Sequence, residues 1–198
     1  MRNVAVLAIL APLFLATACK PPPTDADMLR EIPEAAPSFA SEPLASPSTE
    51  GAKWALSERI EGRLIYGVPG EPALLSLDCD TADSPTIRIT RISPADDGAG
   101  ALLALVGNGH IGRLAVDATD VGGRSIWVGE AQAVDEVWEP LAGPRELIAT
   151  VPGAGTVGIN ASIVPGLHIE ACRIGEQLTN AALEEAAEPQ TETLPLPR

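Results

Sequence analysis

Aromatic residues are scarce in this chain: only 3% of its 198 residues are Phe, Trp or Tyr. Proteins that bind single-stranded nucleic acid stack successive bases on aromatic side chains, and carbohydrate sites use the same kind of platform. A stacking platform of either kind is therefore not expected here.

Basic residues are also few. The chain has 13 Lys and Arg against 27 Asp and Glu, and its formal net charge is −14. Affinity for nucleic acid comes largely from Lys and Arg that neutralise phosphates. This charge therefore excludes nucleic acid as a partner and disfavours anionic lipid surfaces, whereas a strongly acidic surface serves solubility.

Histidine is limited to His110 and His168. A Ser-His-Asp relay or a zinc site would have to use one of them. His110 falls in an expected hairpin turn. His168 lies four residues before Cys172, where a helix-face or cap position is the simpler interpretation. The sequence therefore indicates no catalytic residue, no metal ligand set and no cofactor.

The N-terminal segment contains the most informative pattern. Val4 to Phe14 is an apolar run that follows Arg2, with the length of a signal-peptide core. It is too short to cross a bilayer, which needs about 20 apolar residues. Small residues, Ala16 and Ala18, come just before Cys19.

Residues 1–20 resemble the signal peptide and lipobox of bacterial lipoproteins. The resemblance implies cleavage before Cys19 and acylation of that cysteine by the lipoprotein processing and sorting machinery. The lipid bilayer is then a lasting partner, because two or three acyl chains hold a protein stably. Lys20 stands where an aspartate would favour retention in the inner membrane. In a Gram-negative host this implies the outer membrane, with the protein facing the periplasm.

Two cysteines remain after Cys19 is acylated, Cys79 and Cys172. An even pair in an oxidising compartment predicts a disulfide. Metal ligation is the weaker alternative, because neither cysteine belongs to a CxxC motif or lies near a histidine pair.

Composition divides the chain into four parts: a signal peptide (1–18), a Pro/Ala/Ser-rich acidic linker (19–52), a β domain (53–174) and an acidic tail (175–198). The linker has little to bury, so folding would not offset its ordering entropy. The tail is expected to form a frayed helix up to about Ala187, followed by a disordered end.

Short alternations of apolar and polar residues, separated by Gly, Pro, Asn and Asp, predict strands. They fall at 63–66, 75–79, 86–91, 113–118, 126–128, 147–151 and 157–159, and the nearly all-apolar run Ala101–Val106 predicts a central strand. A stripe of helical spacing covers 134–141. The segment 164–173 fits either a last strand or a short helix. We therefore predict an all-β fold, a small antiparallel β-sandwich or partly open barrel, with one or two short helices.

Three further features were weighed as sites. Gly107–Gly112 matches G-x-G-x-x-G, but the alternation after it predicts a hairpin and not the helix that a dinucleotide site needs. Asp80 begins a short turn that resembles the Asp-Thr-Gly/Ala turn of retropepsin-like aspartic proteases. Because Asp78 stands where that family packs an apolar residue, a solvated turn is predicted. Arg124 and Trp127 are candidates for lining a groove, with a core position as the alternative for Trp127.

The leading hypothesis is a non-enzymatic envelope lipoprotein whose β domain binds an envelope protein partner or has a structural role. One alternative is a periplasmic enzyme that uses Asp80 or a histidine, and another is a carrier or chaperone for an apolar ligand. An enzyme requires convergent polar groups in a cleft, a carrier requires an apolar cavity, and a binding module is expected to expose an apolar patch.

Overall fold

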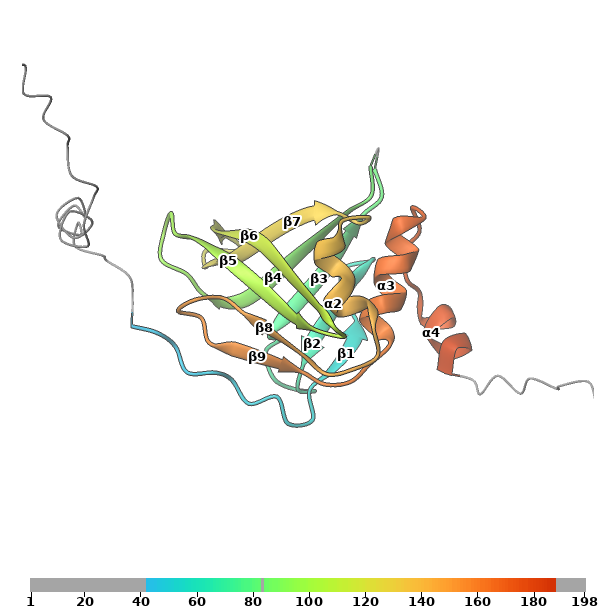
Figure 1. The fold of residues 1–198 in the computed structure, drawn as a ribbon, viewed down its shortest axis with the longest axis horizontal. Helices are drawn as coiled ribbons and strands as arrows, with labels where there is room; N and C mark the ends of the chain where they lie inside the picture. Colours follow the sequence, from blue (N-terminus) through green and yellow to red (C-terminus); the bar gives the residue numbers. More distant parts are fainter. Residues whose placement is uncertain (1–41, 83, 188–198) are drawn as a thin grey trace, which may run out of the picture. The chain divides into compact units, whose positions relative to one another are not determined.

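Nine strands form one antiparallel sheet in this computed structural model, which describes residues 42–82 and 84–187. The strands are β1 (Lys53–Leu56), β2 (Arg63–Gly67), β3 (Leu75–Asp80), β4 (Thr86–Pro94), β5 (Gly100–Gly107), β6 (His110–Asp120), β7 (Ser125–Gln132), β8 (Leu147–Thr150) and β9 (Thr156–Ile159). Their order is β1-β2-β3-β4-β7-β6-β5-β8-β9, and the sheet curls into a nearly closed barrel (Figure 1). The predicted all-β class is confirmed, in its barrel form.

Alternate side chains of each strand point into the barrel and form the core. A row of buried inner residues crosses five neighbouring strands, because each is paired in register with the next. It consists of Trp54, Tyr66, Leu75, Arg91 and Trp127. An arginine at an inner position is unusual, because a buried charge is costly unless it is hydrogen-bonded.

Side-chain hydrogen bonds link β2 to the end of β9, where the two edges of the sheet approach each other. The Tyr66 hydroxyl donates to the carbonyl oxygen of Gly158 (3.0 Å) and accepts from the backbone N–H of Asn160 (3.0 Å). Asn160 Nδ2 in turn donates to the carbonyl oxygens of Thr49 (3.0 Å) and Ala52 (2.8 Å). These contacts join elements about a hundred residues apart and complete the barrel.

Residues 44–52 run beside β9 and belong to this closure. The N–H of Leu44 donates to the carbonyl oxygen of Gly153 (2.8 Å), and the N–H of Thr156 donates to Ser46 Oγ (3.0 Å). Ala52 is buried. The β domain therefore extends into the segment 44–52, which was predicted to belong to the linker.

Helices cover one end of the barrel (Figure 1): η1 (Glu136–Trp138), α2 (Glu139–Ala142) and α3 (Val164–Arg173). The backbone of η1 lies directly on β6, since a Cβ atom at Gly112 would come within 2.2 Å of the carbonyl oxygen of Val137. The single helical stripe predicted at 134–141 is thus two short helices. Its first residue, Val134, is 67% exposed, so the stripe begins later than predicted.

The segment 164–173, for which two interpretations were open, is the helix α3. Cys172 on this helix is disulfide-bonded to Cys79 on β3, with a Cα–Cα distance of 5.8 Å. The structure therefore contains the predicted disulfide, which fixes the helical cover to the barrel wall.

The helix α4 (Asn180–Ala187) agrees with the helix predicted up to about Ala187. Residues 1–18, Cys19 and the end of the tail (188–198) lie outside the described residues. Within the described ranges, no helix combines the length and the apolar character needed to cross a membrane.

Candidate functional site

Four exposed aliphatic side chains gather on the outer face of β5, β6 and β8. Leu102 is 55% exposed, Val106 38%, Ile111 58% and Ile148 44%. Val106 is paired in register with Ile111 on β6 and with Ile148 on β8, so these three form a continuous row. Leu102 lies on the same face of β5, four residues before Val106. We call these four residues the aliphatic surface.

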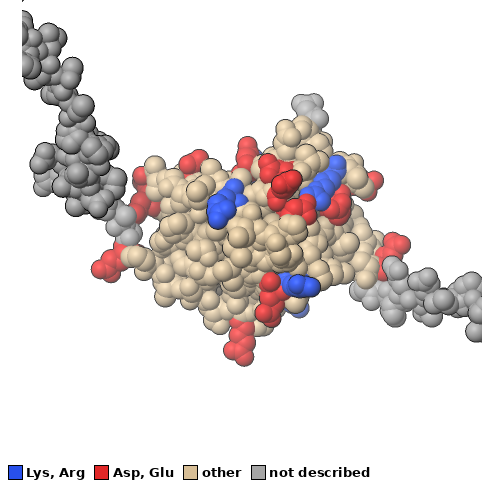
Figure 2. Space-filling model, in the orientation of Figure 1, with Lys and Arg blue, Asp and Glu red and all other residues tan. Residues whose placement is uncertain are grey.

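The chemistry of this face is unusual for an antiparallel sheet. Such sheets commonly bury one face and place polar side chains on the other. Here the inner face of β5 is buried in the barrel, and its outer face is apolar as well. Figure 2 shows a broad area without charged side chains on the side where β5 and β8 lie in Figure 1. Exposed apolar patches of this kind mark interaction sites.

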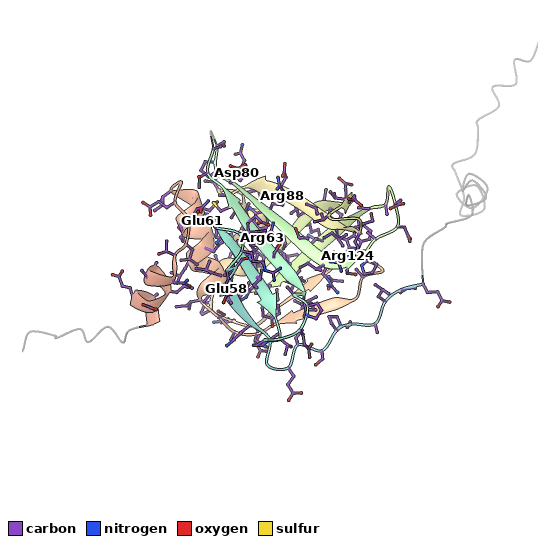
Figure 3. The ribbon with its side chains drawn as sticks, turned by 180° about the vertical axis from the view of Figure 1, so that it is seen from behind. Glu58, Glu61, Arg63, Asp80, Arg88 and Arg124 are labelled. Atoms are coloured by element: carbon purple, nitrogen blue, oxygen red, sulfur yellow. A yellow bond between two sulfur atoms is a disulfide. The ribbon has the colours of Figure 1, made fainter. Side chains whose placement is uncertain are left out.

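The outer face of β2, β3, β4 and β7 provides the contrast. Arg63, Asp78, Arg88 and Glu130 lie in register on these four strands, with charges that alternate along the row. Arg63 is ion-paired with Asp78, and Arg88 Nη2 lies 3.1 Å from Glu130 Oε2. Figure 3 labels Arg63 and Arg88 on this face. Here the barrel wall is a solvated surface, which shows that the uncovered apolar side is not a general property of the sheet.

Carboxylates border the aliphatic surface on two sides. On the β6 side, a hollow of about 480 Å³ contains acidic side chains next to Ile111. Its residues are His110, Ile111, Gly112, Arg113, Asp135, Glu136, Val137 and Glu139. On the β8 side, a second hollow of about 450 Å³ includes Val106, Ile148 and Glu146. A ligand that covers the aliphatic surface therefore meets carboxylates at its margins, together with Arg113, which faces outward on β6 two residues from Ile111.

The residues weighed as catalytic candidates lie in separate places. Asp80 ends β3, where its Oδ1 accepts a hydrogen bond from the N–H of Ala82 (3.0 Å). This is the solvated turn that the sequence predicted. His110 lies in the hollow on the β6 side, whereas Asp80 lies in a different hollow with Arg88 and Glu130. The structure does not bring the carboxylate and this histidine together.

His168 is fully buried on α3. Neither ring nitrogen has a hydrogen-bond partner among the described residues. Burial lowers the pKa of His168 to about 4, although the nearby Asp78 carboxylate acts in the opposite direction. The imidazole is therefore neutral at pH 7 and is a core side chain.

The remaining candidates are the Gly107–Gly112 segment and the pair Arg124 and Trp127. Asn108 and Gly109 adopt the left-handed backbone conformation, with φ of 51° and 83°, and they join β5 to β6. The predicted hairpin is confirmed, and the dinucleotide loop is excluded because no helix follows. Trp127 is buried, so its core interpretation is correct. Arg124 lines a hollow at the junction of β4 and β7.

The aliphatic surface was not predicted from the sequence, although a signal was present. The run Ala101–Val106 was interpreted as a central strand, which it is. Such a run places apolar side chains on both faces, and only the three-dimensional arrangement shows that the outer face is uncovered. No group of three or more His, Cys, Asp or Glu in the described ranges is arranged to hold a metal ion. No family model, curated protein or solved structure matches this chain.

Proposed function

We propose that this protein is a lipid-anchored lipoprotein of the cell envelope, without enzymatic activity, whose β domain binds a protein partner through the aliphatic surface. The N-terminal pattern that ends at Cys19 supports the anchor and the envelope location. The exposed row of Val106, Ile111 and Ile148 carries the proposal for binding.

The margins of the surface indicate the chemistry of the partner. Three carboxylates, those of Asp135, Glu136 and Glu139, border it with Arg113 on the β6 side, and Glu146 borders it on the β8 side. The chain as a whole has a net charge of −14, so a second copy would bring further negative charge to the same margins. The partner is therefore a different protein, with aliphatic or aromatic side chains at the centre of its contact and Lys or Arg at the edge. This arrangement of an apolar centre and a polar rim is typical of protein interfaces.

Ile111→Lys and Ile148→Lys test this surface directly. Both positions are exposed, so neither change should alter the free energy of unfolding by more than about 0.5 kcal/mol. Each places a charge in the middle of the proposed contact, where an unpaired buried charge is strongly unfavourable. Ile174→Lys is the matched control, because Ile174 is 71% exposed and follows α3, away from the surface.

The readout is site-specific photocrosslinking in cells, with the photoreactive residue at position 111, 148 or 174. We expect one discrete adduct from 111 and 148, none from 174, and loss of the 111 adduct when Ile148→Lys is added. Identical adducts from all three positions would contradict the proposal. An adduct of twice the mass of the chain would show that the partner is a second copy, which also contradicts it.

A further inference from the structure

A second candidate site lies at the opposite end of the barrel from the helices. A hollow of about 280 Å³ opens between the end of β4 and the start of β7, and Figure 3 places Arg124 at the end away from α3. We call this hollow the mouth site. Its residues are Ile92, Ser93, Pro94, Ala95, Arg124, Ser125 and Ile126. Apolar side chains make up most of its lining, and barrel mouths are frequent ligand sites.

Hydrogen-bond donors without partners gather beside this hollow. Ser93 lines it and is only 4% exposed, and its hydroxyl has no hydrogen-bond partner among the described residues. Arg91 Nε and Trp127 Nε1 are likewise buried and unpartnered, but both side chains belong to the inner row of the barrel and neither lines the hollow. Buried polar groups are nearly always hydrogen-bonded. The Ser93 hydroxyl can donate a hydrogen bond, so an acceptor in the hollow would supply the partner that it lacks.

The backbone at this point is irregular in a way that often accompanies a site. The register between β4 and β7 shifts between Arg91 and Pro94. Bulges and irregularities of this type re-aim side chains and are over-represented next to functional sites. Here the shift lies at the position of the unpartnered Ser93 hydroxyl.

The two arginines near the hollow, Arg91 and Arg124, indicate the charge that a ligand would carry. Arg91 hydrogen-bonds only to backbone carbonyls, those of Leu74 (3.2 Å), Ile92 (3.1 Å) and Ala154 (3.0 Å). No carboxylate neutralises it in these bonds. None of the ion pairs among the described residues involves Arg124, which stands exposed at the rim. The flanking segments also carry carboxylates, Asp97 after β4 and Asp120 at the end of β6, so the contact with an anion depends on Arg124 itself and not on a general positive charge.

We infer that the mouth site binds a medium-chain aliphatic carboxylate. The aliphatic chain lies against Ile92, Pro94 and Ile126, and the carboxylate accepts hydrogen bonds from Arg124 and the Ser93 hydroxyl. At roughly 30 Å³ for each water-sized group, the hollow holds about nine such groups. This is the size of a carboxylate with about six to eight carbons.

Octanoate is the probe, titrated by calorimetry into the mature chain 19–198 with Cys19→Ser, which carries no acyl chain of its own. Backbone amide NMR shifts locate the bound probe. We expect shifts confined to 92–95 and 124–126. Octanol and octylamine test the charge, and acetate tests the aliphatic chain. Each of the three should bind at least about tenfold more weakly than octanoate, the factor expected when a charged hydrogen bond or the apolar contact is lost.

Two variants and a matched control complete the test. Arg124→Gln should weaken octanoate binding by about tenfold or more, and Ser93→Ala by about three- to tenfold. Arg145→Gln removes the same charge from an exposed arginine that is not part of the mouth site, and it should change binding less than about twofold. The inference is overturned if octanoate does not bind, if octanol binds equally well, if Arg145→Gln has the effect of Arg124→Gln, or if the amide shifts lie elsewhere. The comparison among probes uses the unsubstituted site, so the test does not depend on the folding of the variants.

Discussion

Tyr66→Phe should open the barrel at the closure between β2 and β9. Tyr66 is fully buried, and its hydroxyl serves two backbone groups, the carbonyl of Gly158 and the N–H of Asn160, both at 3.0 Å. Phenylalanine keeps the ring and its contact with Trp54 but leaves both groups without a partner. Each buried unsatisfied group costs about 1–3 kcal/mol. We expect the free energy of unfolding to fall by about 2–4 kcal/mol and the melting temperature by about 10 °C.

The assay is urea unfolding of the oxidised chain 19–198 with Cys19→Ser, followed by circular dichroism. Thr119→Val is the matched control, because it removes an exposed hydroxyl that donates a single bond of 3.3 Å to the carbonyl oxygen of Asp117. This control should change the free energy of unfolding by less than about 0.5 kcal/mol. Hydrogen exchange of the Asn160 amide should accelerate in Tyr66→Phe, because its acceptor is gone.

The pH dependence gives a second, independent check. Burial raises the pKa of Tyr66 above its ordinary value of 10, although the hydrogen bond from the Asn160 backbone acts against this shift. The folded state therefore favours the protonated phenol, and this contribution to stability is complete below pH 10 and is lost as the pH rises through the folded pKa. Tyr66→Phe should lack this alkaline loss. A variant with wild-type stability and an unchanged alkaline profile would refute the role of the hydroxyl in closing the barrel.

Three further predictions concern other parts of the chain. Because burial lowers the pKa of His168 to about 4 from its ordinary 6.5, stability should be complete above pH 6.5 and fall by up to about 3 kcal/mol as the pH drops through 4; His168→Met should flatten this part of a urea-derived pH profile. Cys79→Ala with Cys172→Ala removes a disulfide that spans 93 residues, and urea unfolding should show a loss of about 4–5 kcal/mol in the chain-entropy model. Cys19→Ser should abolish incorporation of labelled palmitate and release the protein from the membrane fraction; palmitate labelling that persists in this variant would remove the basis of the anchor.

Eight of the nine strands were predicted, because local sequence patterns specify them, whereas β1 (Lys53–Leu56) was missed. In β3, the period of two placed Leu75, Leu77 and Cys79 on one face, and all three are buried. The Asn108-Gly109 turn was predictable for a similar reason, since these residues tolerate positive φ at low cost. The disulfide followed from counting cysteines, without any geometry.

The strand order could not be predicted from local patterns. β4 is followed in sequence by β5 but pairs with β7. Hairpin signals specify only neighbours in sequence, and both the β4–β5 and the β6–β7 connections contain turn-forming residues. The closure by Tyr66 joins residues 92 and 94 positions apart, and no periodicity reports such a contact.

The role of the segment 44–52 was missed for a different reason. Its proline and serine content is typical of a linker, and composition does not report the hydrogen bonds that Leu44 and Ser46 form with the β8–β9 region. Pairing with an existing strand edge satisfies the backbone of a segment that has little to bury.

Arg91 is the residue at which the sequence pattern and the chemistry of the site disagree most. Its period-two neighbours Ile87 and Ile89 point into the barrel, and the same period points Arg91 inward. Departures from local consistency are expected where closure or function requires them. Arg91 donates hydrogen bonds to three backbone carbonyls, which help to close this end of the barrel. Its Nε has no partner among the described residues. That remaining donor lies inside the barrel and does not line the mouth site, whose own unpartnered group is the Ser93 hydroxyl.

The aliphatic surface and the mouth site lie on different strands, β5, β6 and β8 for the first and β4 and β7 for the second. Because they share no residue, substitutions in one should leave the other intact. Ile111→Lys should abolish the photocrosslink and keep the octanoate affinity within about twofold. Arg124→Gln should weaken octanoate binding by about tenfold or more and leave the photocrosslink unchanged. If octanoate instead changes the yield of the crosslink at position 148, the two sites are coupled through the barrel, and by linkage the partner must change the affinity for octanoate by the same factor.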